Sequence, residues 1–281
     1  MANRALLVGI NDYQGINDLR GCINDVTNMR DILKTYHGFT NKDIRVLVDR
    51  RATKANILKR LRWMVDGAKP GDFLVFHFSG HGSQIRDRDG DELQDHMDEL
   101  ICPWDMNWDD GFITDDMLNE IFSQLKKNIL LEVCLDCCHS GTGLRGDGLG
   151  RPAELGPENQ TLDRYLPPPM DIVCRSAGEE DELEPSRGFA SETRSTLKHI
   201  LWSGCMANQT SADAYIKGTY NGAFTYYFCQ HLRKTGGQLD RRKLLKRIRN
   251  SLRHHGYWQI PQLECSATAK KIKALTVKAK A

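Results

Sequence analysis

The sequence predicts an α/β protein with a mostly parallel central sheet and helices on both faces, in a single domain of 281 residues. Short apolar runs rich in Val, Leu, Ile and Phe alternate with segments of helical spacing, as expected when a parallel sheet is covered on both faces. Hydrophobic residues make up 40% of the chain, which is enough to fill the core of one such domain.

Each expected element follows from its local pattern. Continuous apolar runs predict strands at 4–10, 45–49, 72–79, 129–136, 171–174 and 199–205. Apolar positions three or four residues apart predict helices at 21–36, 53–66, 113–125, 222–232 and 239–255. Thr53 and Thr114 are expected to cap two of these helices, because a threonine side chain accepts a hydrogen bond from the first turn. Patches of alternation in 261–277 indicate an edge strand.

The character of the sequence changes after residue 141. Residues 142–196 are rich in Gly, Pro and charge, which predicts a long exposed loop between two structured blocks, 1–141 and 197–281. Neither block has enough predicted strands and helices to form a complete domain. We therefore expect both blocks to share one sheet in a single domain over 1–281.

The composition excludes several classes of function. The net charge is +2, so no strong field favours binding to nucleic acid or to a membrane. The basic run 239–255 is typical of a packed helix with a solvated basic face; the alternative, a nucleic-acid patch, lacks interleaved aromatic residues. Nine cysteines at irregular spacing indicate free thiols in a reducing compartment. No segment has the length of a signal peptide or a membrane span, so we expect a cytoplasmic protein.

Two predicted strands end in side chains that carry chemistry. FLVFHFSGHGSQ places His81 between two glycines, and LLEVCLDCCHSGTG ends in an acid followed by two cysteines. Ligands and catalytic groups gather at the carboxyl ends of parallel strands. Because side chains alternate along a strand, Asp136 and Cys138 share a face and Cys137 points to the other, while Ser79 shares a face with His81.

A cysteine nucleophile needs a base within hydrogen-bond reach. His81 is the strongest candidate, and His139 is a rival because it follows Cys138 directly in the sequence. The backbone N–H groups of Gly82 and Cys138 could form an oxyanion hole beside this pair.

These motifs resemble the caspase-like cysteine peptidases, specifically the metacaspases and their prokaryotic relatives. The resemblance extends over nearly the whole chain except 144–196, and it implies the caspase–hemoglobinase fold. It rests on eight segments in order: VGINDY (8–13), LRGCINDV (19–26), HFSGHGSQ (77–84), DELICPWD (98–105), ITDDML (113–118), LDCCHSGTG (135–143), WSGCMANQTSADA (202–214) and GAFTYYF (222–228).

The resemblance implies a cysteine endopeptidase in which His81 and Cys138 form the catalytic dyad. Asp25 and Asp136 match the positions at which metacaspases bind a basic residue, and Ser79 would line the same pocket. Two carboxylates favour Arg or Lys before the scissile bond, so we expect cleavage after Arg or Lys and not after Asp. The structural alternatives are a first-turn helix acid for Asp25 and a strand-end cap for Asp136.

The resemblance also raises the question of a metal. No cofactor is required for the chemistry, but some metacaspases bind activating calcium through dispersed acids, and Asp98, Asp115 and Asp116 stand at such positions. A further acid is expected soon after the cysteine motif, and the nearest here is Asp147, beyond Arg145. This departure counts against calcium, and capping of a helix start is the alternative for Asp115 and Asp116.

The resemblance implies peptide or protein substrates with Arg or Lys before the scissile bond, and a monomer. It also implies that the enzyme could cut itself in the segment 142–196. Six arginines stand there: Arg145, Arg151, Arg164, Arg175, Arg187 and Arg194.

Three other interpretations stay open. Cys134 and Cys137 form a C-x-x-C, which is typical of a thiol–disulfide redox site. His77, His81 and Cys138 could together bind zinc. A catalytically silent protein that binds partners through the caspase-like fold is the third, although the intact dyad argues against it.

Overall fold

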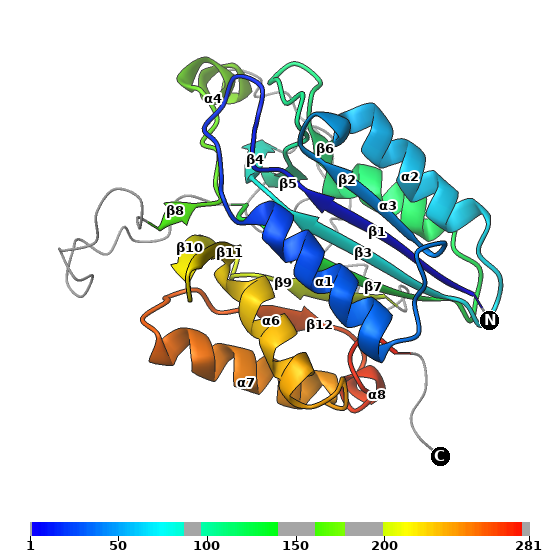
Figure 1. The fold of residues 1–281 in the computed structure, drawn as a ribbon. Helices are drawn as coiled ribbons and strands as arrows, with labels where there is room; N and C mark the ends of the chain where they lie inside the picture. The colour runs from blue at the N-terminus through cyan, green and yellow to red at the C-terminus, as the bar shows by residue number, and fades with distance from the viewer. Residues whose placement is uncertain (1, 87–96, 140–160, 178–198, 277–281) are drawn as a thin grey trace.

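The central sheet carries strands from both ends of the chain (Figure 1). In this computed structural model, the described residues are 2–86, 97–139, 161–177 and 199–276. The sheet has the order β12–β9–β7–β3–β1–β2, and its neighbours are parallel except for the antiparallel edge pair β12–β9. Its strands are β1 (Asn3–Gly9), β2 (Ile44–Val48), β3 (Phe73–Ser79), β7 (Leu130–Asp136), β9 (Ile200–Ser203) and β12 (Gln262–Glu264). This confirms the predicted sheet and its C-terminal edge strand.

Helices cover both faces of the sheet (Figure 1). One face carries α1 (Cys22–Tyr36), α6 (Ala223–Lys234) and α7 (Arg241–His254), with the short α8 (Ala267–Lys270) beside α7; the other carries α2 (Lys54–Asp66) and α3 (Asp115–Ser123). As predicted, Thr53 and Thr114 cap α2 and α3 through their side chains. Within the described ranges, no helix combines the length and the apolar character needed to cross a membrane.

The core has two layers because alternate side chains of the strands point to opposite faces. Val75 lies in the hydrophobic cluster under α1, α6 and α7, whereas its neighbour Phe76 lies in the cluster under α2 and α3. Both strand residues are fully buried. The sheet is therefore covered on both faces, which accounts for the continuous apolar runs in the sequence.

Two small antiparallel sheets lie at the carboxyl ends of the strands of the central sheet. The first contains β4 (Gly82–Arg86), β5 (Met97–Ile101) and β6 (Ile113–Thr114), and the second contains β8 (Leu162–Asp163), β10 (Ala212–Ile216) and β11 (Thr219–Gly222). β4 follows directly from the end of β3, and β10 follows β9. A short 3₁₀ helix, η1 (Asp49–Arg51), follows β2.

Two expectations for the segment after residue 141 are wrong. Residues 171–174, predicted as a strand, lie in the helix α4 (Met170–Ala177). Pro169 precedes this helix and its carbonyl accepts from two N–H groups of the first turn, where Asp171 also suits the helix dipole. The segment is also not an exposed loop throughout, because β8 joins a sheet and Arg164 is completely buried.

Candidate active site

His81 follows the end of β3 and is held from two sides. Its Nε2 lies 2.8 Å from the carbonyl oxygen of Asn17, and its backbone N–H donates to the hydroxyl of Tyr13. A carbonyl oxygen only accepts, so Nε2 carries the proton and Nδ1 carries the lone pair. Burial lowers the pKa of His81 to about 4, so the imidazole is neutral at pH 7.

Cys138 lies just beyond the end of β7 and its thiol is buried. The N–H of Ser211 donates to the sulfur, and the Ser211 hydroxyl donates to the carboxylate of Asp136. Asp136 and Cys138 therefore share a side, as their parity predicted. Cys137 packs into the hydrophobic cluster on the opposite face, with its sulfur 3.8 Å from Nε2 of His139. His139, the alternative base, therefore contacts the thiol of Cys137 and not that of Cys138.

A segment of the chain itself runs through the space between these groups. β8 pairs antiparallel with β10, and the N–H of the next residue, Arg164, donates to the carbonyl oxygen of Ser211. The carbonyl oxygen of Arg164 then accepts two hydrogen bonds, from the N–H of Gly82 at 3.0 Å and from the N–H of Cys138 at 3.2 Å. The two N–H groups expected to form an oxyanion hole thus converge on one carbonyl oxygen.

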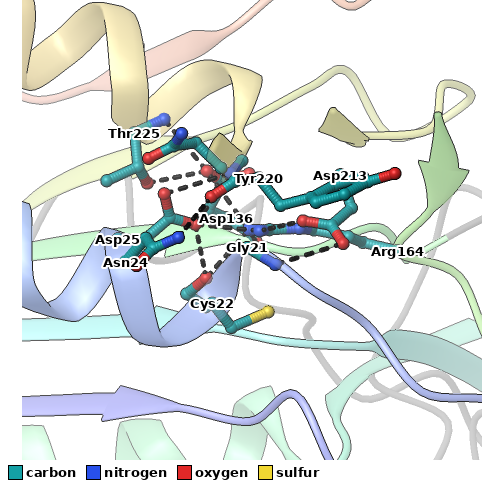
Figure 2. A network of polar contacts seen from close by, with 12 residues as sticks. Gly21, Cys22, Asn24, Asp25, Asp136, Arg164, Asp213, Tyr220 and Thr225 are labelled. Atoms are coloured by element: carbon teal, nitrogen blue, oxygen red, sulfur yellow. Dashed lines mark hydrogen bonds and ion pairs between the residues drawn. The ribbon is translucent and has the colours of Figure 1, made fainter. Parts of the chain in front are cut away.

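The side chain of Arg164 fills an acidic pocket (Figure 2). Its Nη2 lies 2.8 Å from Asp25 and 3.0 Å from Asp213, and its Nη1 lies 3.3 Å from the carboxylate of Asp136. Nη1 also donates to the hydroxyl of Ser79 at 2.9 Å. Burial works against the charged guanidinium, but the surrounding negative groups, these carboxylates among them, raise the pKa of Arg164 well above its ordinary value. The structure brings together all three residues predicted to line a pocket for a basic side chain.

The N-terminus of α6 holds two of the carboxylates of this pocket. The N–H of Gly222 donates to both oxygens of Asp25 at 3.0 Å, and the N–H and hydroxyl of Thr225 donate to Asp136. A helix N-terminus presents unpaired N–H groups and a positive dipole end, so it stabilises both carboxylates. A side chain at position 222 would collide with the carboxylate of Asp136 and the guanidinium of Arg164, so the close approach requires glycine.

Burial also changes the protonation of the pocket. It raises the pKa of Asp25 from 3.8 to about 8; the neighbouring charge of Asp136 acts in the same direction, and Arg164 and Ser79 oppose the shift. Because three carboxylates face one guanidinium, a bound proton reduces the excess of negative charge.

Sequence reasoning missed several residues of this site. Asp213 is the third carboxylate, and it is itself held by the N–H groups of Arg20 and Gly21. The sequence did offer a signal for Asp213. It is an acid in the segment 202–214, which resembles the metacaspases, and it stands two residues after Ser211, which contacts Cys138. Asn17 acts through its backbone, which leaves no trace in residue type. Arg164 was one of six candidate cleavage positions, and no local pattern distinguished it.

The residues predicted to bind calcium lie away from this pocket. Asp98 is buried on β5, and Asp115 and Asp116 open α3, which follows the neighbouring strand β6. Over the ranges 2–86, 97–139, 161–177 and 199–276, no group of three or more His, Cys, Asp or Glu side chains is placed to hold a metal ion. Asp147 lies outside the described residues. The calcium site stays a prediction, and no step of the chemistry is derived through a metal.

The zinc and redox interpretations do not fit the geometry. His77 is buried and its Nε2 faces the hydroxyl of Thr225, whereas Nε2 of His81 faces Asn17. The two histidines therefore do not converge. Cys134 and Cys137 lie in the hydrophobic clusters on opposite faces of the sheet, so this C-x-x-C cannot close a disulfide without moving the backbone.

Comparison with known proteins identifies the class to which these features belong. The family described as "Metacaspase, peptidase C14 domain" matches residues 3–146, which is half of the chain. Metacaspase-1 of Ajellomyces capsulatus is 35% identical over 94% of this chain and 79% of its own length. Metacaspase-1 of Pyricularia oryzae is 34% identical over 94% of this chain and 71% of its own length. The chain belongs to the metacaspase family, and it is therefore a cysteine-type peptidase.

A solved structure extends the likeness of the fold. The crystal structure of a protein from Geobacter sulfurreducens matches 99% of this chain and 99% of its own, with a TM-score of 0.67 and 23% sequence identity. At this identity the likeness concerns the fold alone. Together with the observed sheet and the family, it confirms the predicted caspase–hemoglobinase-like architecture.

Proposed function

We propose that this protein is an endopeptidase that cleaves after arginine or lysine through His81 and Cys138, and that its first substrate is its own Arg164–Tyr165 bond. The observation that carries the proposal is the position of the segment around Arg164. It adds a strand to β10, directs its carbonyl oxygen at two N–H groups and buries its side chain in the acidic pocket. Extended peptides bind to proteins in this way when a sheet edge recognises the backbone and a pocket recognises one side chain.

The charge of the pocket supports the expected specificity. Asp25, Asp136 and Asp213 surround the guanidinium, and an aspartate side chain in the same place would be repelled. The two terminal nitrogens of arginine reach different carboxylates, whereas lysine brings a single ammonium group. We therefore expect cleavage after Arg to be faster than cleavage after Lys, and cleavage after Asp to be negligible.

The proposed chemistry uses the groups in sequence. Nδ1 of His81 takes the thiol proton of Cys138, and the sulfur attacks the carbonyl carbon of Arg164. The charge that develops on the carbonyl oxygen is held by the N–H groups of Gly82 and Cys138. His81 then gives its proton to the nitrogen of Tyr165, the peptide bond breaks, and water hydrolyses the thioester to release the thiol.

One rearrangement precedes the first step. The thiol of Cys138 is bonded to the backbone of Ser211, and no hydrogen bond joins it to His81 in this structure. A rotation about the Cα–Cβ bond of Cys138 would release the sulfur from Ser211 and turn it toward the imidazole. The backbone of Cys138, which already binds the carbonyl oxygen of Arg164, does not have to move.

Self-cleavage tests the proposal directly. Purified protein incubated with reductant is expected to yield a fragment that begins at Tyr165, identified by mass spectrometry, at a rate independent of protein concentration. Cys138→Ala and Arg164→Gln should abolish this fragment, while Cys137→Ala and Arg175→Gln serve as matched controls that keep it. Paired fluorogenic peptides ending in Arg, Lys or Asp test the specificity of the same samples.

The outcomes separate the possible functions. Cleavage after Asp would contradict the pocket assignment but keep the peptidase. Absence of cleavage in any sample, with and without calcium, would favour the silent scaffold. Cleavage that appears only with calcium would support the predicted metal site, and Asp98→Asn should then abolish the cleavage that calcium activates.

A further inference from the structure

We propose that the site also selects the second residue after the scissile bond, and that it favours leucine or a similar apolar side chain there. The inference rests on the proposed function, since it takes the segment around Arg164 as a bound substrate. It assigns a recognition role to the carbonyl oxygen of Gly82 and to the side chain of Ser83, neither of which the chemistry described above uses.

The backbone that follows the scissile bond pairs with the start of β4 in the manner of a parallel strand. Gly82 donates its N–H to the carbonyl oxygen of Arg164, and its own carbonyl oxygen accepts from the N–H of Leu166 at 2.9 Å. This exchange makes a parallel bridge between Gly82 and Tyr165. The residues after the scissile bond therefore run along β4, and the residues before it run along β10.

Ser83 adds one more hydrogen bond to the backbone of this segment. Its hydroxyl donates to the carbonyl oxygen of Leu166 at 2.5 Å, and the residue is completely buried. A buried hydroxyl without a partner is costly, so this position favours a substrate carbonyl that meets it. Both polar backbone groups of Leu166 are thus bonded, to Gly82 and to Ser83.

The side chain of Leu166 adds an apolar component. It is partly buried and packs against the hydrophobic cluster under α2 and α3, to which Ile85 of β4 and Leu100 of β5 belong. A charged side chain packed against this apolar cluster would lose hydration, which is costly. Residues 167–169 are prolines, which have no N–H to donate, so strand pairing with β4 cannot continue past Leu166 along this segment.

Peptides test this inference with the enzyme as it exists. The full chain after self-processing, and in parallel the Arg164→Gln chain, would be assayed on peptides of sequence TLDRYLPP in which the second residue after Arg is Leu, Gly or Asp. Burial of a leucine side chain predicts a kcat/KM about tenfold higher for Leu than for Gly, with Asp lowest.

A coumarin amide of TLDR provides the internal reference, because it has no residue in the position of Leu166. Ser83→Ala is expected to lower kcat/KM for the Leu peptide about fivefold more than for the amide, as expected for one lost hydrogen bond. Ser123→Ala, at an exposed serine of α3, should leave this ratio unchanged.

Two results would count against the inference. Equal rates for the Leu, Gly and Asp peptides, with cleavage after Arg intact, would overturn it while leaving the proposed function in place. Failure to cleave any peptide, including the amide, would overturn the proposed function and this inference with it.

Discussion

Arg164 places a full positive charge among three carboxylates, and all four side chains are completely buried. A buried charge is tolerated when its partners are present and is strongly destabilising when they are removed. If the segment around Arg164 leaves after cleavage, the pocket retains carboxylates that need another cation. At the scale of single residues, the same contacts that hold this arginine are therefore expected to select the substrate.

Asp213 provides a test of this selection. It shares Nη2 of Arg164 with Asp25, so Asp213→Asn should lower kcat/KM for arginine substrates by 30-fold or more, on the basis of about 2 kcal/mol or more for a truncated buried charge pair. The loss for lysine substrates should be smaller, because one ammonium cannot reach every carboxylate. Steady-state kinetics on Arg and Lys amides measures both.

The control for this substitution is Asp31→Asn, which removes an exposed acid from α1 that pairs with Arg30. It should leave both substrates unaffected, since exposed pairs contribute little. Equal losses for Arg and Lys substrates in Asp213→Asn would contradict the assignment of Asp213 to the arginine side chain.

The raised pKa of Asp25 predicts that the stability of the fold depends on pH. Its pKa is raised to about 8, so the folded protein keeps a proton that the unfolded chain releases above pH 3.8. The stabilisation from this proton is present at low pH and is lost as pH rises from about 4 to 8. Its slope approaches about 1.4 kcal/mol per pH unit.

Urea unfolding between pH 5 and 8 measures this slope, with Cys138→Ala as the parent so that the chain stays intact. The parent should lose stability more steeply with rising pH than the same chain with Asp25→Asn. Parallel curves for the two proteins would show that Asp25 is ionised throughout this range.

At the scale of elements, a second buried ion pair ties α7 and the C-terminal segment to the sheet. Nη2 of Arg241 lies 2.6 Å from Glu132 on β7, and both side chains are completely buried. Glu132 also accepts from the indole N–H of Trp202 on β9 and from the N–H of Leu275. One carboxylate thus joins two neighbouring strands, a helix and the C-terminal segment.

Breaking this pair is expected to destabilise the fold without changing specificity. Arg241→Met should lower the free energy of unfolding by about 3–5 kcal/mol, because it leaves Glu132 buried without its cation. The double variant Glu132→Leu with Arg241→Met should lose less, and both should keep the preference for Arg over Asp. Equilibrium unfolding and peptide assays test the two statements separately; additive losses would contradict the coupling.

At the scale of the whole molecule, the proposed cleavage point divides the central sheet between two fragments. β7 would belong to residues 1–164 and β9 to residues 165–281, yet these strands pair directly. Helices α1 and α6, one from each fragment, also pack against each other (Figure 1). The fragments therefore share one sheet and one of its hydrophobic layers.

We expect the cleaved protein to remain a single particle. After self-processing, two bands should appear on a denaturing gel, while the elution volume in size-exclusion chromatography stays that of the uncleaved Cys138→Ala protein. The shared sheet predicts that the fragments separate in denaturant. Separation under native conditions would mean that the interface between β7 and β9 needs the intact chain.

Local pattern determined much of this structure. The apolar runs predicted the strands of a parallel sheet. Parity along β7 predicted Cys138 on the face of Asp136 and Cys137 on the opposite face, because alternation of side chains is a property of any strand. Threonine caps predicted the starts of α2 and α3. The strand predicted at 171–174 failed because a short apolar run has no clear period, and the prolines before it begin a helix.

The pairing of distant groups was decided by the tertiary structure. Asp25, Ser79 and Asp136 could be named from the sequence, but Asp213 and Arg164 joined them because β10 and β8 fold over the carboxyl edge of the sheet. Arg164, one of the six arginines considered from the sequence, is buried against these carboxylates. The sequence by itself determined which residues are candidates for the chemistry, because strand parity and motif spacing are local properties. The long-range packing of strands decided that Arg164 lies among them.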